Sequence, residues 1–326
     1  MKFFNTNVRT AFISSAIAIV AGCASHRILE HSSHTFTIPV LPDTQEAVTR
    51  KNEMFFSQMQ WIADKKDSLK TPIVLHVGDV ANFDTITHWE TASRGYALLD
   101  KVKLPYAITL GNHDTRAVGW NSGSAADPAN TNKRLRMTEK FNAAFPVNRF
   151  TLQKGRYEND KSDNSYYTFS AGGLKWMVVT LEFCAREKVV QWMDGVIGQH
   201  PHHNVIILTH YHLTPKGEIA ATNAGYGDMS PKDIFEKYIR NHPNVLLILS
   251  GHNCYSAYRT DKGVRQNPIY QILSDYQCRD DGGGYIRLLD IDTREKKITA
   301  KMYSPYYHKT LADDSHFVLS GINFIQ

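Results

Sequence analysis

The sequence predicts an α/β fold organised around a mainly parallel sheet. Three successive units of apolar strand, polar loop and helical segment occupy the first third of the chain. Each of these strands ends on Asp or Asn, and two later buried-type strands end on His. Repeated βαβ units give parallel strands whose carboxyl ends lie along one edge. Open α/β sheets bind ligands at that edge, so the polar strand ends are the candidate site.

The first three units justify this prediction in order. The expected strands are residues 35–41, 71–77 and 104–108, and the expected helices are residues 46–69 and 89–101. The loops after the strands carry Asp43 and Gln45, then Asp79, then Gly111-Asn112-His113-Asp114. Taken alone, the last tetrapeptide could also be an ordinary turn, because Gly and Asn tolerate left-handed backbone and Asp bonds locally.

Residues 115–165 depart from this rhythm, being rich in Gly, Asn, Ser, Pro and charged residues. We expect an insertion that forms a lid or substrate wall over the polar edge, with a helix near residues 134–145. Arg116, Trp120, Arg134 and Arg136 are candidates for contacting an anionic or ring-bearing substrate. The alternative for each of them is an ordinary solvated loop residue.

The second half continues with strands, helices and two further polar strand ends. Expected strands are residues 166–169, 174–181, 204–209, 244–249, 268–273, 284–291 and 298–303, and expected helices are 187–198 and 231–241. His210 follows the strand 204–209, and His252 and Cys254 follow the strand 244–249. His200, His202 and His203 lie in a proline-containing loop and are interpreted as solvated.

The amino terminus has the pattern of an export signal. Lys2 and Arg9 precede an apolar run that is too short to span a bilayer, and the run ends Val-Ala-Gly before Cys23. This ending resembles a bacterial lipoprotein cleavage box, which implies lipidation of Cys23; the alternative is an ordinary secretory signal. We therefore expect a signal peptide at 1–22, a tether at 23–34 and one domain at 35–326. The resemblance implies a lipid-anchored protein of the bacterial outer membrane, facing the periplasm or the cell surface.

Charge and cysteine content limit the alternatives. Loss of Lys2 and Arg9 leaves 35 Lys and Arg against 32 Asp and Glu, a net charge of +3 that gives no indication of nucleic-acid binding. Three cysteines then remain in an oxidising compartment, Cys184, Cys254 and Cys278. One disulfide can form, and Cys254 with Cys278 is the first candidate pair. The sequence does not indicate an oligomeric state.

The ordered strand ends resemble the signature of the calcineurin-like metallophosphoesterase family. That signature runs Asp-x-His, Gly-Asp, Gly-Asn-His-Asp/Glu, a later His, and Gly-His-x-His, and the resemblance covers roughly residues 35–260. It implies a four-layer α/β/β/α sandwich with two mixed sheets. It also implies two metal ions (Mn, Fe or Zn), a small phosphorylated substrate, and hydrolysis of phosphomonoesters or phosphodiesters by a metal-bridging hydroxide.

The resemblance assigns a role to each strand end. Asp79 would bridge both metals, Asp43 would bind the first, and Asn112, His210 and His252 would bind the second. His113 would donate a proton to the leaving group or stabilise the transition state, and Asp114 would orient the site. Asn82 falls where some members keep an acidic partner for the catalytic histidine.

Two positions depart from the signature, and both belong to the first metal. Gln45 and Cys254 replace histidines; a thiolate at Cys254 would suit zinc or iron, whereas a disulfide would remove it from the site. The main alternative to an enzyme is therefore a degenerate member that binds a phosphorylated ligand without turnover.

Overall fold

The computed structural model describes residues 1–2, 34–119, 129–279 and 282–326. The chain divides into two units, Met1–His31 and Ser32–Gln326. The predictions for the signal segment, the lipidated Cys23 and Trp120 lie outside the described residues. Among the residues that are described, no helix has both the length and the hydropathy that crossing a membrane requires.

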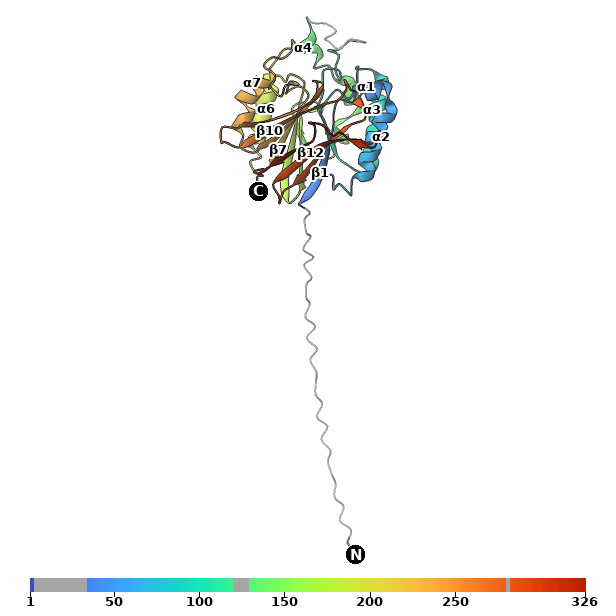
Figure 1. Cartoon of the computed structure of the whole chain (residues 1–326), viewed down its shortest axis with the longest axis vertical. Coiled ribbons are helices and arrows are strands. Elements are labelled where there is room, and N and C mark those ends of the chain that lie inside the picture. The colour runs from blue at the N-terminus through green and yellow to red at the C-terminus, as the bar shows by residue number, and fades with distance from the viewer. Residues whose placement is uncertain (3–33, 120–128, 280–281) are drawn as a thin grey trace. The chain divides into compact units, whose positions relative to one another are not determined.

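Two seven-stranded mixed sheets form the Ser32–Gln326 unit (Figure 1). The first has the order β13-β12-β11-β1-β2-β3, with β14 on β12, and the second has the order β4-β5-β6-β7-β8-β10-β9. Strands β1, β2 and β3 are parallel, as are β6, β7, β8 and β10. The strands of the first sheet are β1 (Thr35–Leu41), β2 (Val74–His76), β3 (Tyr106–Ile108), β11 (Ile286–Asp292), β12 (Lys297–Ser304), β13 (Lys309–Thr310) and β14 (Phe317–Ser320). Those of the second are β4 (Gln153–Arg156), β5 (Ser165–Ala171), β6 (Leu174–Leu181), β7 (Asn204–Thr209), β8 (Val245–Ser250), β9 (Tyr255–Lys262) and β10 (Pro268–Asp275).

Helices cover the outer faces of the two sheets. In Figure 1, α1 (Gln45–Arg50), α2 (Asn52–Lys65) and α3 (Ile86–Lys101) lie on one side, and α6 (Glu187–Gly198) and α7 (Pro231–Lys237) lie on the other. Strand β6 shows how the layers are made: Trp176 and Val178 join the core shared with the first sheet, and Met177 and Val179 join the core under α6 and α7. This alternation buries both faces of the strand. The predicted four-layer α/β/β/α sandwich is confirmed.

Several predicted elements have different limits. The helix expected at 46–69 is two helices, because Lys51 has non-helical dihedral angles (φ −132°, ψ 57°). The side-chain Nδ2 of Asn52 donates to the carbonyls of Ala47 (3.2 Å) and Val48 (2.5 Å). These bonds satisfy carbonyl oxygens that the last turn of α1 leaves without a partner in the helix. Strand β2 has three residues where seven were expected. The helix expected at 134–145 is replaced by α4 (Thr131–Arg134) and α5 (Glu139–Ala144).

The insertion 115–165 belongs partly to the sandwich. Its strand β4 pairs antiparallel with β5 and so extends the second sheet, which the sequence analysis did not predict. Strands β9, β13 and β14 were also missed. Strand β9 alternates between exposed and half-buried residues at the sheet edge, so its sequence lacks the apolar run that identified the buried strands. Short single-turn 3₁₀ helices at Val147–Arg149 and Ile239–Asn241 complete the described elements.

A disulfide joins Cys254 to Cys278, with 5.8 Å between their Cα atoms, as the first candidate pairing predicted. It connects the turn after β8 to the turn after β10. The buried Cys184 is a free thiol.

Removing this disulfide should lower stability substantially. The cross-link closes a loop of 24 residues, so the double substitution Cys254→Ser with Cys278→Ser is expected to cost roughly 3 kcal/mol of unfolding free energy. We expect a melting temperature lower by roughly 5–10 °C in calorimetry. A non-reduced peptide digest analysed by mass spectrometry verifies the bridge in the parent chain, and an unchanged melting temperature would contradict the prediction.

Candidate metal centre

Three of the predicted site residues follow the parallel strands of the first sheet. Asp43 lies beyond β1, Asp79 beyond β2 and Asn112 beyond β3, and all three are buried. Main-chain amides hold both carboxylates: His252 N donates to Asp43 Oδ2 (3.1 Å), and His113 N donates to Asp79 Oδ1 (2.9 Å). The shared edge of parallel strands therefore brings these side chains together as predicted.

Two histidines enter the same site from the second sheet. His210 follows β7, and its Nδ1 bonds to the Val77 carbonyl (2.8 Å), so Nε2 points toward the carboxylates. That Nε2 lies 3.1 Å from Asp79 Oδ2 and 3.8 Å from Asp43 Oδ2. His252 follows β8, and its Nδ1 lies 3.1 Å from Asn112 Oδ1. Histidines that bind metals commonly donate their other ring N–H to a carbonyl in this way.

Two glycines allow the main chain to lie directly against the Asp79 and Asp43 carboxylates. A methyl group on Gly111 would overlap the Asp79 carboxylate, and one on Gly251 would overlap the Asp43 carboxylate. Asp79 (φ +50°) and His252 (φ +71°) themselves occupy the left-handed region, which non-glycine residues rarely adopt. Such strained conformations concentrate at functional sites, where the surrounding fold holds them in place.

His113 and Asp114 have distinct positions. The His113 Nδ1 bonds to the Asn82 main-chain carbonyl (2.7 Å), so Nε2 is the nitrogen available on its ring. The partner that orients the imidazole is thus the main-chain carbonyl of Asn82, the residue that stands where some members keep an acidic side chain. Asp114 is fully buried and accepts from Ala81 N (3.0 Å) and Gly111 N (2.9 Å), joining two of the loops. Burial and the Asp79 carboxylate raise the pKa of Asp114 to about 7.

The pKa values of the two central carboxylates, Asp79 and Asp43, are shifted in opposite directions. Burial opposes the charge of Asp79, but the neighbouring His210 and His113 hold its pKa below the usual range. Burial and the adjacent carboxylates raise the pKa of Asp43 well above its usual value. The ligand-type atoms of Asp79, His210 and His252 lie within 4.8 Å of one another. A cavity of about 380 Å³ is lined by Asp79 and His252 and also by Gln45, Asn112 and His113.

These residues fit divalent metal ions. The Gln45 Oε1 atom is buried and has no hydrogen-bond partner. An unpaired buried polar atom costs free energy, and a bound cation would satisfy it. Carboxylate and amide oxygens together with imidazole suit manganese, iron and zinc, and the donor set does not select among them.

Comparison with known proteins identifies the family. Residues 36–256 match the family described as calcineurin-like phosphoesterase. The chain belongs to the calcineurin-like phosphoesterase family. A curated relative, the uncharacterized protein YvnB of Bacillus subtilis, is 28% identical over 282 residues; the match covers 83% of this chain. The chain spans about 20% of the length of that relative.

Solved structures show the same fold at low identity. A dimetal phosphatase from Danio rerio superposes with a TM-score of 0.55 at 12% identity, covering 87% of this chain and 98% of the phosphatase. GAP50, the anchor in the inner membrane complex of Plasmodium, superposes with a TM-score of 0.50 at 9% identity, covering 90% of each chain. The calcineurin-like phosphoesterase resemblance predicted from the strand ends is confirmed.

The first site of this calcineurin-like phosphoesterase differs from the family signature. Cys254 stands where the signature has its last histidine, and its sulfur is bonded to Cys278. The prediction of Cys254 as a thiolate ligand is therefore wrong, because a disulfide sulfur carries no charge to offer a metal. Gln45 lines the cavity together with Asp79, and its Oε1 atom has no hydrogen-bond partner.

The insertion arginines predicted as substrate contacts are not among the described residues that line the metal cavity. Arg116 approaches Asp84 (3.7 Å) and Glu139 (3.8 Å), and it is not among the described residues lining the metal cavity. Arg136 donates to the carbonyls of Phe183 (3.0 Å) and Cys184 (2.7 Å) and forms ion pairs with Glu182 and Asp228. Arg134 ends α4 and also lies outside the cavity lining. The substrate contacts of these arginines stay predictions.

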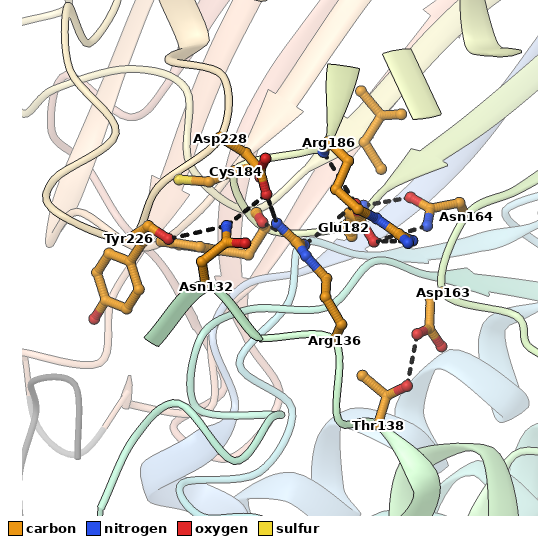
Figure 2. A network of polar contacts seen from close by, with 12 residues as sticks. Asn132, Arg136, Thr138, Asp163, Asn164, Glu182, Cys184, Arg186, Tyr226 and Asp228 are labelled. Atoms are coloured by element: carbon orange, nitrogen blue, oxygen red, sulfur yellow. Dashed lines mark hydrogen bonds and ion pairs between the residues drawn. The ribbon is translucent and has the colours of Figure 1, made fainter. Parts of the chain in front are cut away.

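Figure 2 shows what Arg136 does instead. Its guanidinium lies between Glu182, which also binds Arg186, and Asp228, which also accepts from Asn132 (2.5 Å). The network anchors the insertion to the loop after β6 and to the loop that carries Tyr226 and Asp228. Tyr226 in turn reaches the metal centre, because its hydroxyl accepts from Asn112 Nδ2 (3.1 Å).

Tyr226 is therefore expected to orient a metal ligand. Its bond to Asn112 Nδ2 directs Asn112 Oδ1 toward His252, so Tyr226→Phe should lower metal affinity or activity by about 10–100-fold. Isothermal titration with Mn²⁺ measures the affinity. Tyr238→Phe is the matched control, because its hydroxyl bonds to Glu187 on the outer helical layer. Equal titration curves for both variants would mean that the Tyr226 hydroxyl does not position Asn112.

Sequence reasoning missed several residues around the cavity. Glu46 accepts from Asn82 Nδ2 (2.9 Å) and pairs with Arg50 (3.1 Å), and all three residues line the cavity. Gln277 lines its opposite part with Cys278. Asp275 ends β10 and is fully buried near Asp43. The strand-end rule that selected Asp79 would have selected Asp275 too, had it been applied to the strand predicted at 268–273.

Proposed function

We propose that this protein is a metal-dependent phosphohydrolase that cleaves phosphomonoesters or phosphodiesters. The observation that carries the proposal is the convergence of Asp43, Asp79 and Asn112 from one sheet with His210 and His252 from the other. The family membership and the shared fold of a dimetal phosphatase support it.

The arrangement divides the chemistry among residues of this chain. Two cations bound at the centre would neutralise the phosphate oxygens and lower the pKa of a coordinated water. His113 lines the cavity with Nδ1 already bonded, so its Nε2 can give a proton to the leaving oxygen. Asp114 keeps His113 in place by bonding to the amides of the flanking loops. Arg50, which pairs with Glu46, is the only arginine among the described residues that line the cavity, so it could contact an anionic ester.

A hydrolysis assay tests the proposal. Purified protein should release the chromophore from a nitrophenyl phosphomonoester or from a bis-nitrophenyl phosphodiester when manganese, zinc or ferrous iron is added. A chelator should stop the release, and added metal should restore it. Absence of turnover with every metal, while two metal ions are bound per chain, would refute hydrolysis as the function.

A second candidate function is binding of a phosphorylated ligand without turnover. The disulfide at Cys254 favours it, since the signature histidine of the first site is missing. Inorganic phosphate would then bind the metal-loaded protein in calorimetry while both chromogenic esters stay intact. The presence of His113 and of every predicted second-site residue in the cavity region argues for the hydrolase.

We further propose that the chain works outside the cytoplasm, anchored by a lipid on Cys23. The disulfide supports an oxidising compartment, where such bonds persist. Cells labelled with a radioactive fatty acid should incorporate label into the parent chain and not into Cys23→Ser. Equal labelling of both chains would refute the anchor.

A further inference from the structure

We propose that Asp275 completes the first metal site and takes the ligand position that Cys254 vacates by forming the disulfide. This inference rests on the proposed metal centre and extends it to a residue outside the matched family segment, which ends at residue 256.

Strand register brings Asp275 to the site. Strand β10 runs parallel to β8, with Leu273 paired to Ser250, and both Asp275 and His252 lie two residues beyond that pair in the same chain direction. His252 N donates to the Asp43 carboxylate (3.1 Å). Strand register therefore brings Asp275 to the edge of the sheet at which Asp43, a residue of the first site, accepts from the His252 amide.

Buried carboxylates gathered at this place would favour a bound cation. Asp43, Asp79 and Asp275 are all buried, and in the part of the chain that the structure describes no ion pair joins them to a lysine or arginine. Buried like charges are costly unless a positive charge offsets them. Gln45 gives an independent sign of a missing ligand, because its side chain is 95% buried, lines the cavity and leaves Oε1 without a partner.

Asp275 is also held in one orientation. Gln277 donates from its main-chain N to Asp275 Oδ1 (2.9 Å) and from Nε2 to Oδ2 (3.1 Å). Each carboxylate oxygen keeps a second lone pair for a metal. The disulfide at Cys278 fixes the turn that carries Gln277. The same bond that removes a sulfur ligand from the first site therefore holds its replacement in place.

Metal content measures the proposal without reference to activity. Protein stripped with a chelator and dialysed against Mn²⁺ should hold two ions per chain by mass spectrometry, and Asp275→Asn should hold one. Asparagine keeps the shape of the side chain and removes its charge. Asp163→Asn is the matched control, because Asp163 is also buried but bonds to Thr138 and Asn142 away from the site. It should retain two ions.

A second measurement decides the matter if Asp275→Asn does not fold. In crystals of the parent protein soaked in Mn²⁺, an anomalous peak should lie within about 2.5 Å of an Asp275 oxygen. A first-site peak farther than about 4 Å from both oxygens, or two ions bound to a folded Asp275→Asn chain, would overturn the proposal and leave Asp275 as a residue that only supports the turn. Two bound ions in the parent chain without hydrolysis would instead refute the proposed function and leave the role of Asp275 intact.

Discussion

Replacing Asp79 with asparagine is expected to remove bound metal and hydrolysis together. Asp79 lies between the two groups of ligands: His210 Nε2 is 3.1 Å from Oδ2, and the His113 amide holds Oδ1. Asparagine offers one neutral oxygen where two ions would share a carboxylate, so the centre loses both charge and a ligand. We expect turnover to fall by at least about 10³-fold and metal content to fall to one ion or none.

Asp163→Asn is again the control for substitution of a buried aspartate. Far-ultraviolet circular dichroism should show both variants folded. If Asp79→Asn keeps two ions per chain and hydrolyses the chromogenic esters at the parent rate, the proposed centre is wrong.

His113→Ala should separate chemistry from metal binding. The imidazole lies at the cavity, and the main-chain N–H of His113 rather than its ring holds Asp79. Alanine retains that N–H, so metal content should stay at two ions per chain. Loss of a general acid should reduce turnover by about 10²–10⁴-fold, and less for a chromogenic ester whose leaving group needs no proton.

Steady-state kinetics on an alkyl and a nitrophenyl phosphate test this dependence on the leaving group. His202→Ala, at an exposed histidine, should leave both rates unchanged. An equal loss on both substrates would show that His113 stabilises the transition state rather than donating a proton. No loss on either substrate would remove His113 from the mechanism.

The sequence predicted best those elements whose residues are buried on both sides. Strands β6 and β7 have the predicted limits, because near-continuous apolar runs are typical of central parallel strands. The break at Lys51 was missed because the apolar spacing continues across it, whereas the cause is local: the Asn52 side chain bonds to two carbonyls of α1. Edge strands such as β9 have too few buried residues for their period to be recognised.

The sequence predicted those site residues that lie at strand ends or at positions of the family signature. The carboxyl edge of each parallel strand fixes Asp43, Asp79 and Asn112, so their convergence followed from the fold class. The sequence named Cys254 and Cys278 as the first candidate pair but left Cys254 open as a metal ligand, because the choice depends on how closely β8 and β10 lie. Composition also could not indicate that Arg136 has acidic partners within the protein.

The ligands of one centre are far apart along the chain: the His252 amide bonds to Asp43, which precedes it by 209 residues. Loop closure over such a span delays a contact until most of the molecule has organised. Metal ions would consequently bind late in folding, after the two sheets of the sandwich have packed together. A chelator added during refolding should leave the refolding rate unchanged, and loaded ions would then mark the fraction of chains that have completed folding.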